Sequence, residues 1–377
     1  MRTIIGIDAS RNRSGGAMGH LVGILNETDP AAFGIDEVHV WVYKSLADKL
    51  PDFPWLIKHS PPELEDSIFK QVSWQYSHLP KEAKAAGCCV MLYTDAGAFI
   101  NFSPSVVMSR DMLSYEKGEM QRFGLSFAKL RLLLLKYQQV ASMRKANGVI
   151  FLTNYAASVI GGFTGKLKNQ RIIPHGISNI FRLGLEKKQF DKKNIRCVYV
   201  SNTSMYKHQW HVVHAVKALK DQGYPVSLVL VGGGKGKAQK KLEAEMILAD
   251  PDNHFISQLD YLKHHEIPGV LQKADLFIFA SSCENMPNTL IEGMAAGLPI
   301  ACSNRGPMPE VLQDAGLYFD PENPKEIETA MKTLIDNDDI RETMARKAAV
   351  LSLQYSWKRC ADETFAYLSE LCNTSRI

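Results

Sequence analysis

The hydrophobic positions of this chain fall into short apolar runs separated by longer stretches with helical spacing. Runs 3–7, 195–201 and 226–231 are mostly apolar, which is typical of strands buried on both faces of a parallel sheet. In 210–222 and 324–337, apolar residues recur every three or four positions, which predicts helices with one buried face. Alternating strands and helices predict an α/β protein.

The same pattern predicts further elements in both halves of the chain. Strands are expected at 38–42, 89–93, 106–108, 148–153, 171–174, 276–280 and 299–303, and helices at 58–86 (interrupted at its prolines), 340–353 and 355–371. A chain of 377 residues suits two domains better than one core. The polar, Lys-rich stretch 178–194 is the expected linker, which gives domains at 1–178 and 195–355.

Composition narrows the class of protein. A hydrophobic content of 45%, a charged content of 22% and a net charge of +4 describe a globular protein and do not imply nucleic acid as a partner. Seven irregularly spaced cysteines argue against a disulfide framework and for a reducing compartment, with Cys88 and Cys89 buried rather than metal-binding. With neither a signal peptide nor a long apolar span, the expected location is the cytoplasm.

The stretch 275–303 is the most informative part of the sequence. It predicts a buried strand, a polar loop at 281–287, a helix that Gly297 ends, and a second strand from Pro299. Open α/β sheets bind ligands at the carboxyl ends of their strands, and a helix N-terminus there favours phosphate. We therefore expect an anion-binding ligand site at this loop.

Two acids in this stretch, Glu284 and Glu292, are placed to face the same crevice. They suit hydrogen bonds from ligand hydroxyls beside a phosphate that backbone N–H groups hold, and a sugar nucleotide offers both kinds of group. The alternative is structural: Glu292 forms a capping box with Thr289, and Glu284 is a solvated loop acid.

The whole stretch resembles the Glu-x7-Glu region of retaining glycosyltransferases of family four, also called group 1. These enzymes have two facing Rossmann-like domains, with a cleft between them, in the GT-B architecture. The matching residues are Ser281, Ser282, Glu284, Pro287, Leu290, Glu292, Met294, Ala295, Ala296, Gly297 and Pro299. The resemblance is strongest over 197–321 and weak over 27–106. It implies that the last helix, 356–377, crosses back to the first domain.

The resemblance also implies roles for residues of the second domain. Glu292 would bind the nucleotide ribose, Glu284 would lie near the donor sugar and its phosphate, and Lys207 matches the phosphate-binding lysine. The usual Gly-Arg and Lys-Gly are replaced by Ser201-Asn202 and Lys207-His208, so one cation is missing, and Lys207 alone could equally be a solvated lysine at a helix start. The other expected donor-binding residues are Asn202, Gly232, Gly233, Gln258, Leu259, Asn285, Met286, Pro287, Asn288 and Thr289.

Two features of the first domain are candidates for binding. Gly15 and Gly16 follow the first strand, where family members have a Gly-Gly loop that touches the donor phosphate and the acceptor; alone they would indicate only a turn. Arg110 stands where many relatives carry a histidine that faces the donor sugar. It either binds a phosphate or an acidic acceptor, or it pairs with Asp111 or Glu116.

The basic segment 117–145 has two interpretations. Its apolar residues recur at helical spacing beside seven Lys and Arg and a single Glu. It is either a helix packed into the core with a solvated basic face, or an amphipathic helix on an anionic membrane.

Together the residues and the resemblance predict a retaining, metal-independent hexosyltransferase of surface polysaccharide or glycan synthesis. It would move sugar from a nucleotide-diphosphate sugar to a glycan or lipid-linked acceptor, in the cytoplasm or peripherally on the membrane, without a cofactor. Asp250-Pro251-Asp252 looks like a metal motif, but its position between helix and strand predicts a turn. The alternatives are a sugar-nucleotide 2-epimerase of the same architecture and a non-catalytic sugar-nucleotide-binding protein.

Overall fold

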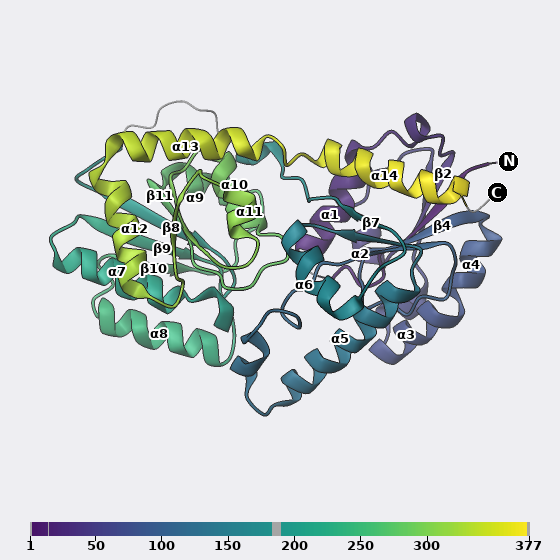
Figure 1. Cartoon of the computed structure of the whole chain (residues 1–377), viewed down its shortest axis with the longest axis horizontal. Helices are drawn as coiled ribbons and strands as arrows, with labels where there is room; N and C mark the ends of the chain where they lie inside the picture. The colour runs from purple at the N-terminus through teal and green to yellow at the C-terminus, as the bar shows by residue number, and fades with distance from the viewer. Residues whose placement is uncertain (1, 14, 183–189, 375–377) are drawn as a thin grey trace. The chain divides into compact units, whose positions relative to one another are not determined.

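The computed structural model describes residues 2–13, 15–182 and 190–374, and divides the chain into two compact units (Figure 1). Unit 1 contains the chain up to Gly176 together with the segment from Tyr355 onward, and unit 2 contains Ile177–Gln354. Part of the predicted linker, 183–189, lies outside the described residues.

Unit 1 is built on a seven-stranded parallel sheet with the strand order β3-β2-β1-β4-β5-β6-β7. Its strands are β1 Ile4–Asp8, β2 Glu37–Trp41, β3 Leu56–His59, β4 Cys88–Tyr93, β5 Ser105–Met108, β6 Gly148–Phe151 and β7 Gln170–Ile172. Its α-helices are α1 Gly15–Glu27, α2 Lys44–Ala47, α3 Ile68–Ser77, α4 Leu79–Ala85, α5 Phe127–Lys145, α6 Asn154–Thr164 and α14 Trp357–Thr374. The most deeply buried strands are almost wholly apolar, as the sequence pattern predicts.

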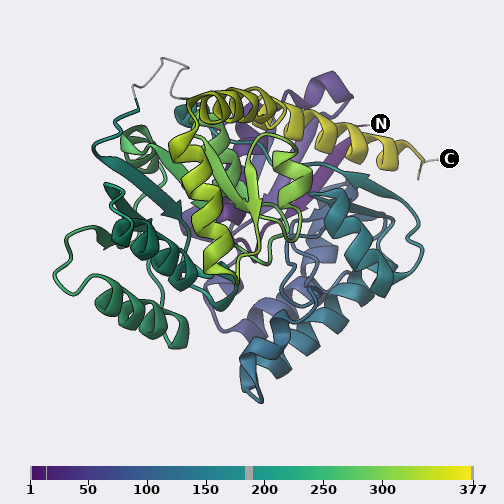
Figure 2. The ribbon, with the colours of Figure 1, turned by 60° about the vertical axis from the view of Figure 1, so that its left-hand side comes forward.

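Unit 2 is built on a six-stranded parallel sheet with the order β10-β9-β8-β11-β12-β13 (Figure 2). Its strands are β8 Ile195–Val200, β9 Val226–Val231, β10 Ile256–Leu259, β11 Leu276–Phe279, β12 Ile300–Ser303 and β13 Leu317–Phe319. Its α-helices are α7 Gln209–Asp221, α8 Lys237–Ala249, α9 Ile267–Lys273, α10 Asn288–Ala295, α11 Met308–Leu312, α12 Pro324–Asp336 and α13 Asp338–Ser352.

Both sheets therefore have the doubly wound order in which the chain starts near the middle and winds outward on both sides. The direction of winding reverses between β1 and β4 in unit 1, and between β8 and β11 in unit 2. Doubly wound folds bind ligands at the carboxyl ends of the two strands that flank this reversal. The predicted α/β fold with two Rossmann-like domains is confirmed.

One predicted helix is wrong in part. The expected helix over 58–86 begins only at Ile68, because Leu56–His59 extends beside β2 as the edge strand β3. Consecutive prolines at Pro61 and Pro62 separate this strand from α3.

The final helix, α14, packs within unit 1 rather than unit 2. Trp357 at its start sits against two glycines: a Cβ on Gly176 would lie 2.2 Å from the Trp357 backbone nitrogen, and one on Gly23 would lie 2.4 Å from its ring. A side chain at either position would clash with the start of α14 unless the backbone or the Trp357 ring moved.

A disulfide between Cys89 of β4 and Cys372 of α14 also fastens this helix to unit 1. The sequence argued against a disulfide framework and did not predict this bridge. The two cysteines are 283 positions apart in the sequence but only 5.4 Å apart between their Cα atoms, so spacing along the chain gave no sign of the pairing. The other five cysteines, Cys88 among them, are buried and form no disulfide. None of the described helices is long and apolar enough to span a bilayer.

Candidate active site

The structure brings Lys207 and Glu284 together at the winding reversal of unit 2. Lys207 ends a short 3-10 turn, Met205–Lys207, in the loop after β8, and Glu284 lies in the loop after the adjacent strand β11. The Lys207 ammonium donates to Glu284 Oε1, and only 8% and 15% of the two side chains are exposed. Two residues 77 positions apart thus form a largely buried ion pair at the edge where such sheets bind ligands.

This ion pair keeps Lys207 charged. Burial acts to lower the pKa of the ammonium, but the neighbouring Glu284 carboxylate more than offsets it, so the pKa is raised above its usual value of 10.5. The backbone carbonyl of Lys207 accepts a hydrogen bond of 2.8 Å from the hydroxyl of the buried Tyr199, which fixes this turn to β8. The site therefore holds a fixed positive charge, suited to a phosphate group that competes with Glu284.

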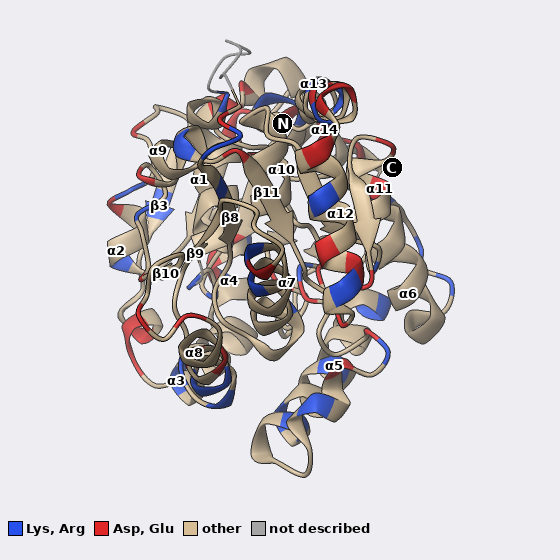
Figure 3. Ribbon diagram, turned by 90° about the vertical axis from the view of Figure 1, so that its left-hand side faces the viewer, with Lys and Arg blue, Asp and Glu red and all other residues tan. Residues whose placement is uncertain are grey.

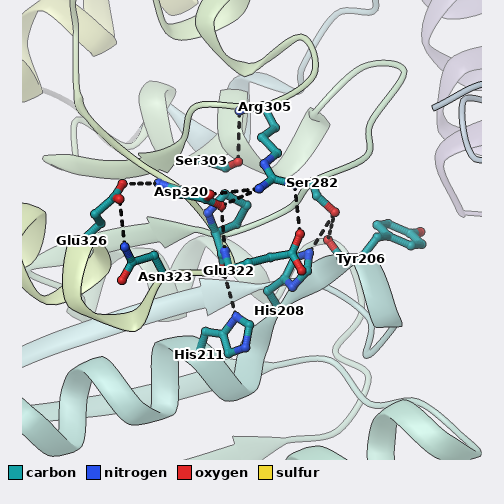
Figure 4. A network of polar contacts seen from close by, with 11 residues as sticks. Tyr206, His208, His211, Ser282, Ser303, Arg305, Asp320, Glu322, Asn323 and Glu326 are labelled. Carbon is teal, nitrogen blue, oxygen red and sulfur yellow. Dashed lines mark hydrogen bonds and ion pairs between the residues drawn. The ribbon is translucent and has the colours of Figure 1, made fainter. Parts of the chain in front are cut away.

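The next residue, His208, joins the two loops (Figure 4). It has φ 48° and ψ 29°, a left-handed conformation that is uncommon for residues other than glycine. Its buried ring is 2.8 Å from the Ser282 hydroxyl, measured from His208 Nε2, and the Ser282 N–H donates to the Tyr206 carbonyl at 2.8 Å. Nothing in the sequence was a reason to assign His208 a role. Many relatives carry a glycine at this position, and such a glycine can indicate that the backbone has a positive φ.

Glu292 lies in the first turns of α10 and does not cap it. The N-terminal flank of α10 is Pro287, no side chain caps the helix, and the capping-box alternative is therefore wrong. Instead Glu292 Oε1 is 3.2 Å from Nε2 of His264, which lies 28 positions earlier in the loop before α9. Burial raises the pKa of Glu292, and the contact with Glu292 raises the pKa of His264.

The second oxygen of Glu292 is available to a ligand. Glu292 Oε2 is buried, and no hydrogen bond to it is found among the described residues. Leaving a buried carboxylate oxygen without a donor costs free energy, which a ligand hydroxyl would recover. The sequence pattern found Glu292, but nothing in it indicated His264 as the residue that orients it.

Gln258, in β10, joins the loops that follow β8 and β9. Its amide donates to the Gly232 carbonyl at 2.9 Å and to the Thr203 hydroxyl at 3.3 Å. Gly232 has φ 110°, and a Cβ there would lie 2.5 Å from the Ser201 carbonyl oxygen, so the position requires glycine. Leu259 follows Gln258 and is 38% exposed, which leaves an apolar side chain beside this polar edge.

The remaining expected residues of unit 2 occupy the same edge of the sheet. Gly233 follows Gly232, and the exposed Asn202 donates to the Ser204 hydroxyl at 3.3 Å. The segment 285–289 runs from the loop after β11 into the first turn of α10, and its members Asn285, Met286 and Pro287 are buried while Asn288 and Thr289 are partly exposed. No side chain caps the helix, and the N–H groups of Asn288 and Leu290 donate to the backbone carbonyls of Met286 and Pro287, each at 3.0 Å.

Arg305 does not replace the missing phosphate-binding arginine. It follows β12, and its guanidinium forms ion pairs of 2.8 Å with Asp320 and 2.9 Å with Glu322 (Figure 4). This guanidinium is therefore already paired with two carboxylates. Asp250 accepts backbone hydrogen bonds from His254, Phe255 and Ile256, so it forms the predicted turn. Over residues 2–13, 15–182 and 190–374, no group of three potential metal ligands is found.

The predicted residues of unit 1 also lie at the carboxyl edge of their sheet. Gly15 and Gly16 form the first turn of α1, which carries no acidic residue there. Arg110 follows β5, and its Nη2 donates at 2.9 Å to Asn12 Oδ1, which also accepts from the Thr94 hydroxyl at 2.8 Å. Burial lowers the pKa of Arg110, with Asp95 and Asp111 acting against this shift, and its Nη1 has no hydrogen bond within the described part of the chain.

The two structural partners considered for Arg110 have other contacts. Asp111 accepts from the Gln139 amide at 3.0 Å, and Glu116 accepts from the Tyr155 hydroxyl at 2.8 Å. Arg110, Gly15 and Gly16 belong to unit 1, whereas Lys207, Glu284 and Glu292 belong to unit 2.

Comparison with known proteins finds a family model that matches most of the second unit. Residues 184–350 match the family model described as glycosyl transferases group 1. The chain is 30% identical over 110 residues to O-antigen chain mannosyltransferase B of Escherichia coli, covering 29% of each chain. It is 27% identical over 184 residues to a GDP-mannose-dependent alpha-(1-6)-phosphatidylinositol dimannoside mannosyltransferase of Mycobacterium tuberculosis, covering 48% of this chain and 46% of the relative.

The solved structures extend the likeness of fold to both units. HepE of Anabaena, solved in complex with UDP, aligns with a TM-score of 0.72 over 98% of this chain and 100% of its own, at 18% identity. The chain spans less than half the length of the curated relatives named above. Residues 184–350, the part that contains Lys207, Glu284 and Glu292, thus match the group 1 glycosyltransferases, and the fold of the chain is the GT-B fold.

Proposed function

We propose that this chain is a retaining glycosyltransferase that uses a nucleotide-diphosphate sugar as its donor. The observation that carries the proposal is the buried Lys207–Glu284 ion pair at the winding reversal of unit 2, inside the region that matches the group 1 family. In this position a fixed cation is available to a diphosphate, and a carboxylate lies beside it for the hydroxyls of the transferred sugar.

Binding of the nucleotide is assigned to the same unit. Glu292 Oε2 accepts a ribose hydroxyl, because this buried oxygen has no donor within the described residues and His264 holds its carboxylate from the other side. The base lies near Gly232, Gly233, Gln258 and Leu259, where backbone carbonyl and amide groups are close to an exposed apolar side chain. Solved structures with this fold that contain UDP or UDP-glucose support this class of donor.

Charge builds up on the leaving diphosphate as the bond from the anomeric carbon to the phosphate oxygen breaks. Lys207 and the positive end of the α10 helix dipole stabilise that charge. The acceptor oxygen attacks the same face of the sugar, and its proton passes to the departing phosphate oxygen. The leaving group thus serves as the base, and configuration is retained without a covalent intermediate or a metal ion.

The acceptor is assigned to unit 1 and is a glycan or a lipid-linked sugar, which places the reaction in polysaccharide or glycan synthesis. Two relatives act in such settings, one named for the O-antigen chain and one for a phosphatidylinositol dimannoside. Arg110, with Nη1 available, suits an acceptor or donor group that carries negative charge.

The experiment is a screen of nucleotide sugars, with and without EDTA, in which release of the nucleoside diphosphate is measured. One donor should give slow hydrolysis, unchanged by the chelator and abolished in Lys207→Ala. An epimerised donor sugar without diphosphate release would identify an epimerase instead. Donor binding without turnover on any glycan or lipid-linked acceptor would identify a non-catalytic binding protein.

A further inference from the structure

The helix α5 carries an apolar stripe on its solvent side. Phe127, Leu130, Leu134 and Tyr137 are spaced three, four and three positions apart, so they lie on one face. Their exposed fractions are 82%, 51%, 62% and 73%, respectively. This is the reverse of an ordinary surface helix, whose apolar stripe faces the core.

The opposite face of α5 is the one that packs into unit 1. Leu132, Gln139, Ser142 and Met143 are its buried residues. The core-packed interpretation of 117–145 is therefore correct for this face and wrong for the exposed stripe. The stripe does not contribute to the core of unit 1, and removing these side chains from water against another surface would be favourable.

The stripe extends beyond the helix at its amino-terminal end. Leu125, two residues before α5, is fully exposed. In Figure 1 and Figure 2 this end of α5 and the loop before it project from the rest of unit 1. A flat surface can therefore reach Leu125 and Phe127 without meeting the sheet of unit 1.

The charge around the stripe has a single sign. Residues 127–145 contain five cations and no acid: Lys129, Arg131, Lys136, Arg144 and Lys145; Figure 3 shows blue segments along α5. Arg131, Arg144 and Lys145 are exposed, and of these Arg144 also donates to the backbone carbonyls of Phe163 and Thr164 and Lys145 to that of Ile100. An interface between two copies of this helix would bring like charges together, whereas an anionic surface would neutralise them.

We propose that α5 is a docking surface for an anionic lipid bilayer. Leu125, Phe127, Leu130, Leu134 and Tyr137 enter the boundary between headgroups and acyl chains, and the flanking cations lie at the lipid phosphates. The tyrosine suits this depth because its ring is apolar and its hydroxyl is polar. The proposal does not depend on the transferase activity, since it uses no residue of the candidate active site.

The test is co-sedimentation of the full chain, without donor, with vesicles of phosphatidylcholine alone or mixed with phosphatidylglycerol. Wild type should bind only the anionic vesicles. It should bind them less at about 1 M than at about 0.1 M salt, because the Debye length falls from about 10 Å to about 3 Å. Leu134→Ser/Tyr137→Ser should weaken binding by about tenfold or more, the loss expected when large apolar side chains no longer leave water.

The matched control lies on α8 in unit 2. Ile247 and Leu248 are 64% and 75% exposed, close to the 62% and 73% of Leu134 and Tyr137, so Ile247→Ser/Leu248→Ser should bind vesicles like wild type. The proposal is overturned if wild type does not bind anionic vesicles at low salt, if it binds neutral vesicles equally, or if the α5 variant binds as well as the control. It is also overturned if sedimentation velocity reveals a dimer that the α5 variant dissociates, because the stripe would then be covered by a second copy.

Discussion

The buried ion pair between Lys207 and Glu284 predicts a large, non-additive effect on stability. Lys207→Met keeps most of the apolar stem but leaves the Glu284 carboxylate, 15% exposed, without its cation. Removing one partner of a buried pair costs about 3–5 kcal/mol, whereas replacing both partners by neutral residues is often close to neutral. Lys207→Met and Glu284→Gln should each destabilise unit 2 by that amount, and the double variant should recover most of the loss.

The assay is urea unfolding of the four proteins of this double-mutant cycle, followed by hydrogen exchange in peptides from β8 and β11. The exposed pair of Lys217 and Asp221, whose side chains are 38% and 61% exposed, is the control in the same unit. Lys217→Met should change stability by about 1 kcal/mol or less, as surface pairs do.

The pH dependence of the cycle follows from the sign of the shift. The pKa of Lys207 is raised above 10.5 in the folded protein, so its contribution is complete below that pH and is lost only as pH rises through the raised pKa. The coupling should therefore be equal at pH 7 and pH 9. Additive effects of Lys207→Met and Glu284→Gln, or a Lys217→Met effect of the same size, would refute the inference that burial makes this pair costly to break.

Three further predictions concern the neighbouring residues. His208→Gly relieves a left-handed conformation that costs about 1–2 kcal/mol, but it also loses a hydrogen bond worth about 1 kcal/mol, so its melting temperature should be near that of wild type. His208→Ala loses the same hydrogen bond and keeps the strained conformation, so its melting temperature should be clearly lower. Glu292→Gln should chiefly raise the donor KM in steady-state kinetics, and a fall in kcat alone would contradict the ribose assignment. The pKa of His264 is raised above 6.5, so the extra stability of wild type over His264→Gln in thermal melts should be present below pH 6.5 and shrink as pH rises.

The parts of the site that the sequence pattern predicts lie in contiguous loops that follow buried strands. Glu284, Glu292 and Lys207 could be found because parallel strands are recognisable as apolar runs and their carboxyl ends share one edge of the sheet. These three residues could be found without knowing the order of the strands. The strand order explains why Lys207 and Glu284 meet, because β8 and β11 are adjacent in the sheet.

The features that sequence reasoning missed depend on contacts between distant positions. His264 contacts Glu292 from 28 positions away, and Cys89 bonds to Cys372 across 283 positions. No local pattern records such pairs, because each residue has an ordinary neighbourhood in the sequence. Likewise, helical spacing shows that α5 has apolar positions, but it does not show which of two apolar faces the core covers.

The contact between His208 and Ser282 bears on how the loop after β8 works without the usual glycine. A histidine in a left-handed conformation persists only where its surroundings compensate the strain, and here the Ser282 hydroxyl and a fully buried ring position supply that compensation. The same contact fixes the loop of Lys207 to the loop of Glu284. Replacing the glycine with histidine therefore exchanges backbone freedom for a side-chain link between the two loops. If this link positions Lys207, the kcat losses of His208→Gly and Ser282→Ala should not add, because either substitution alone breaks it.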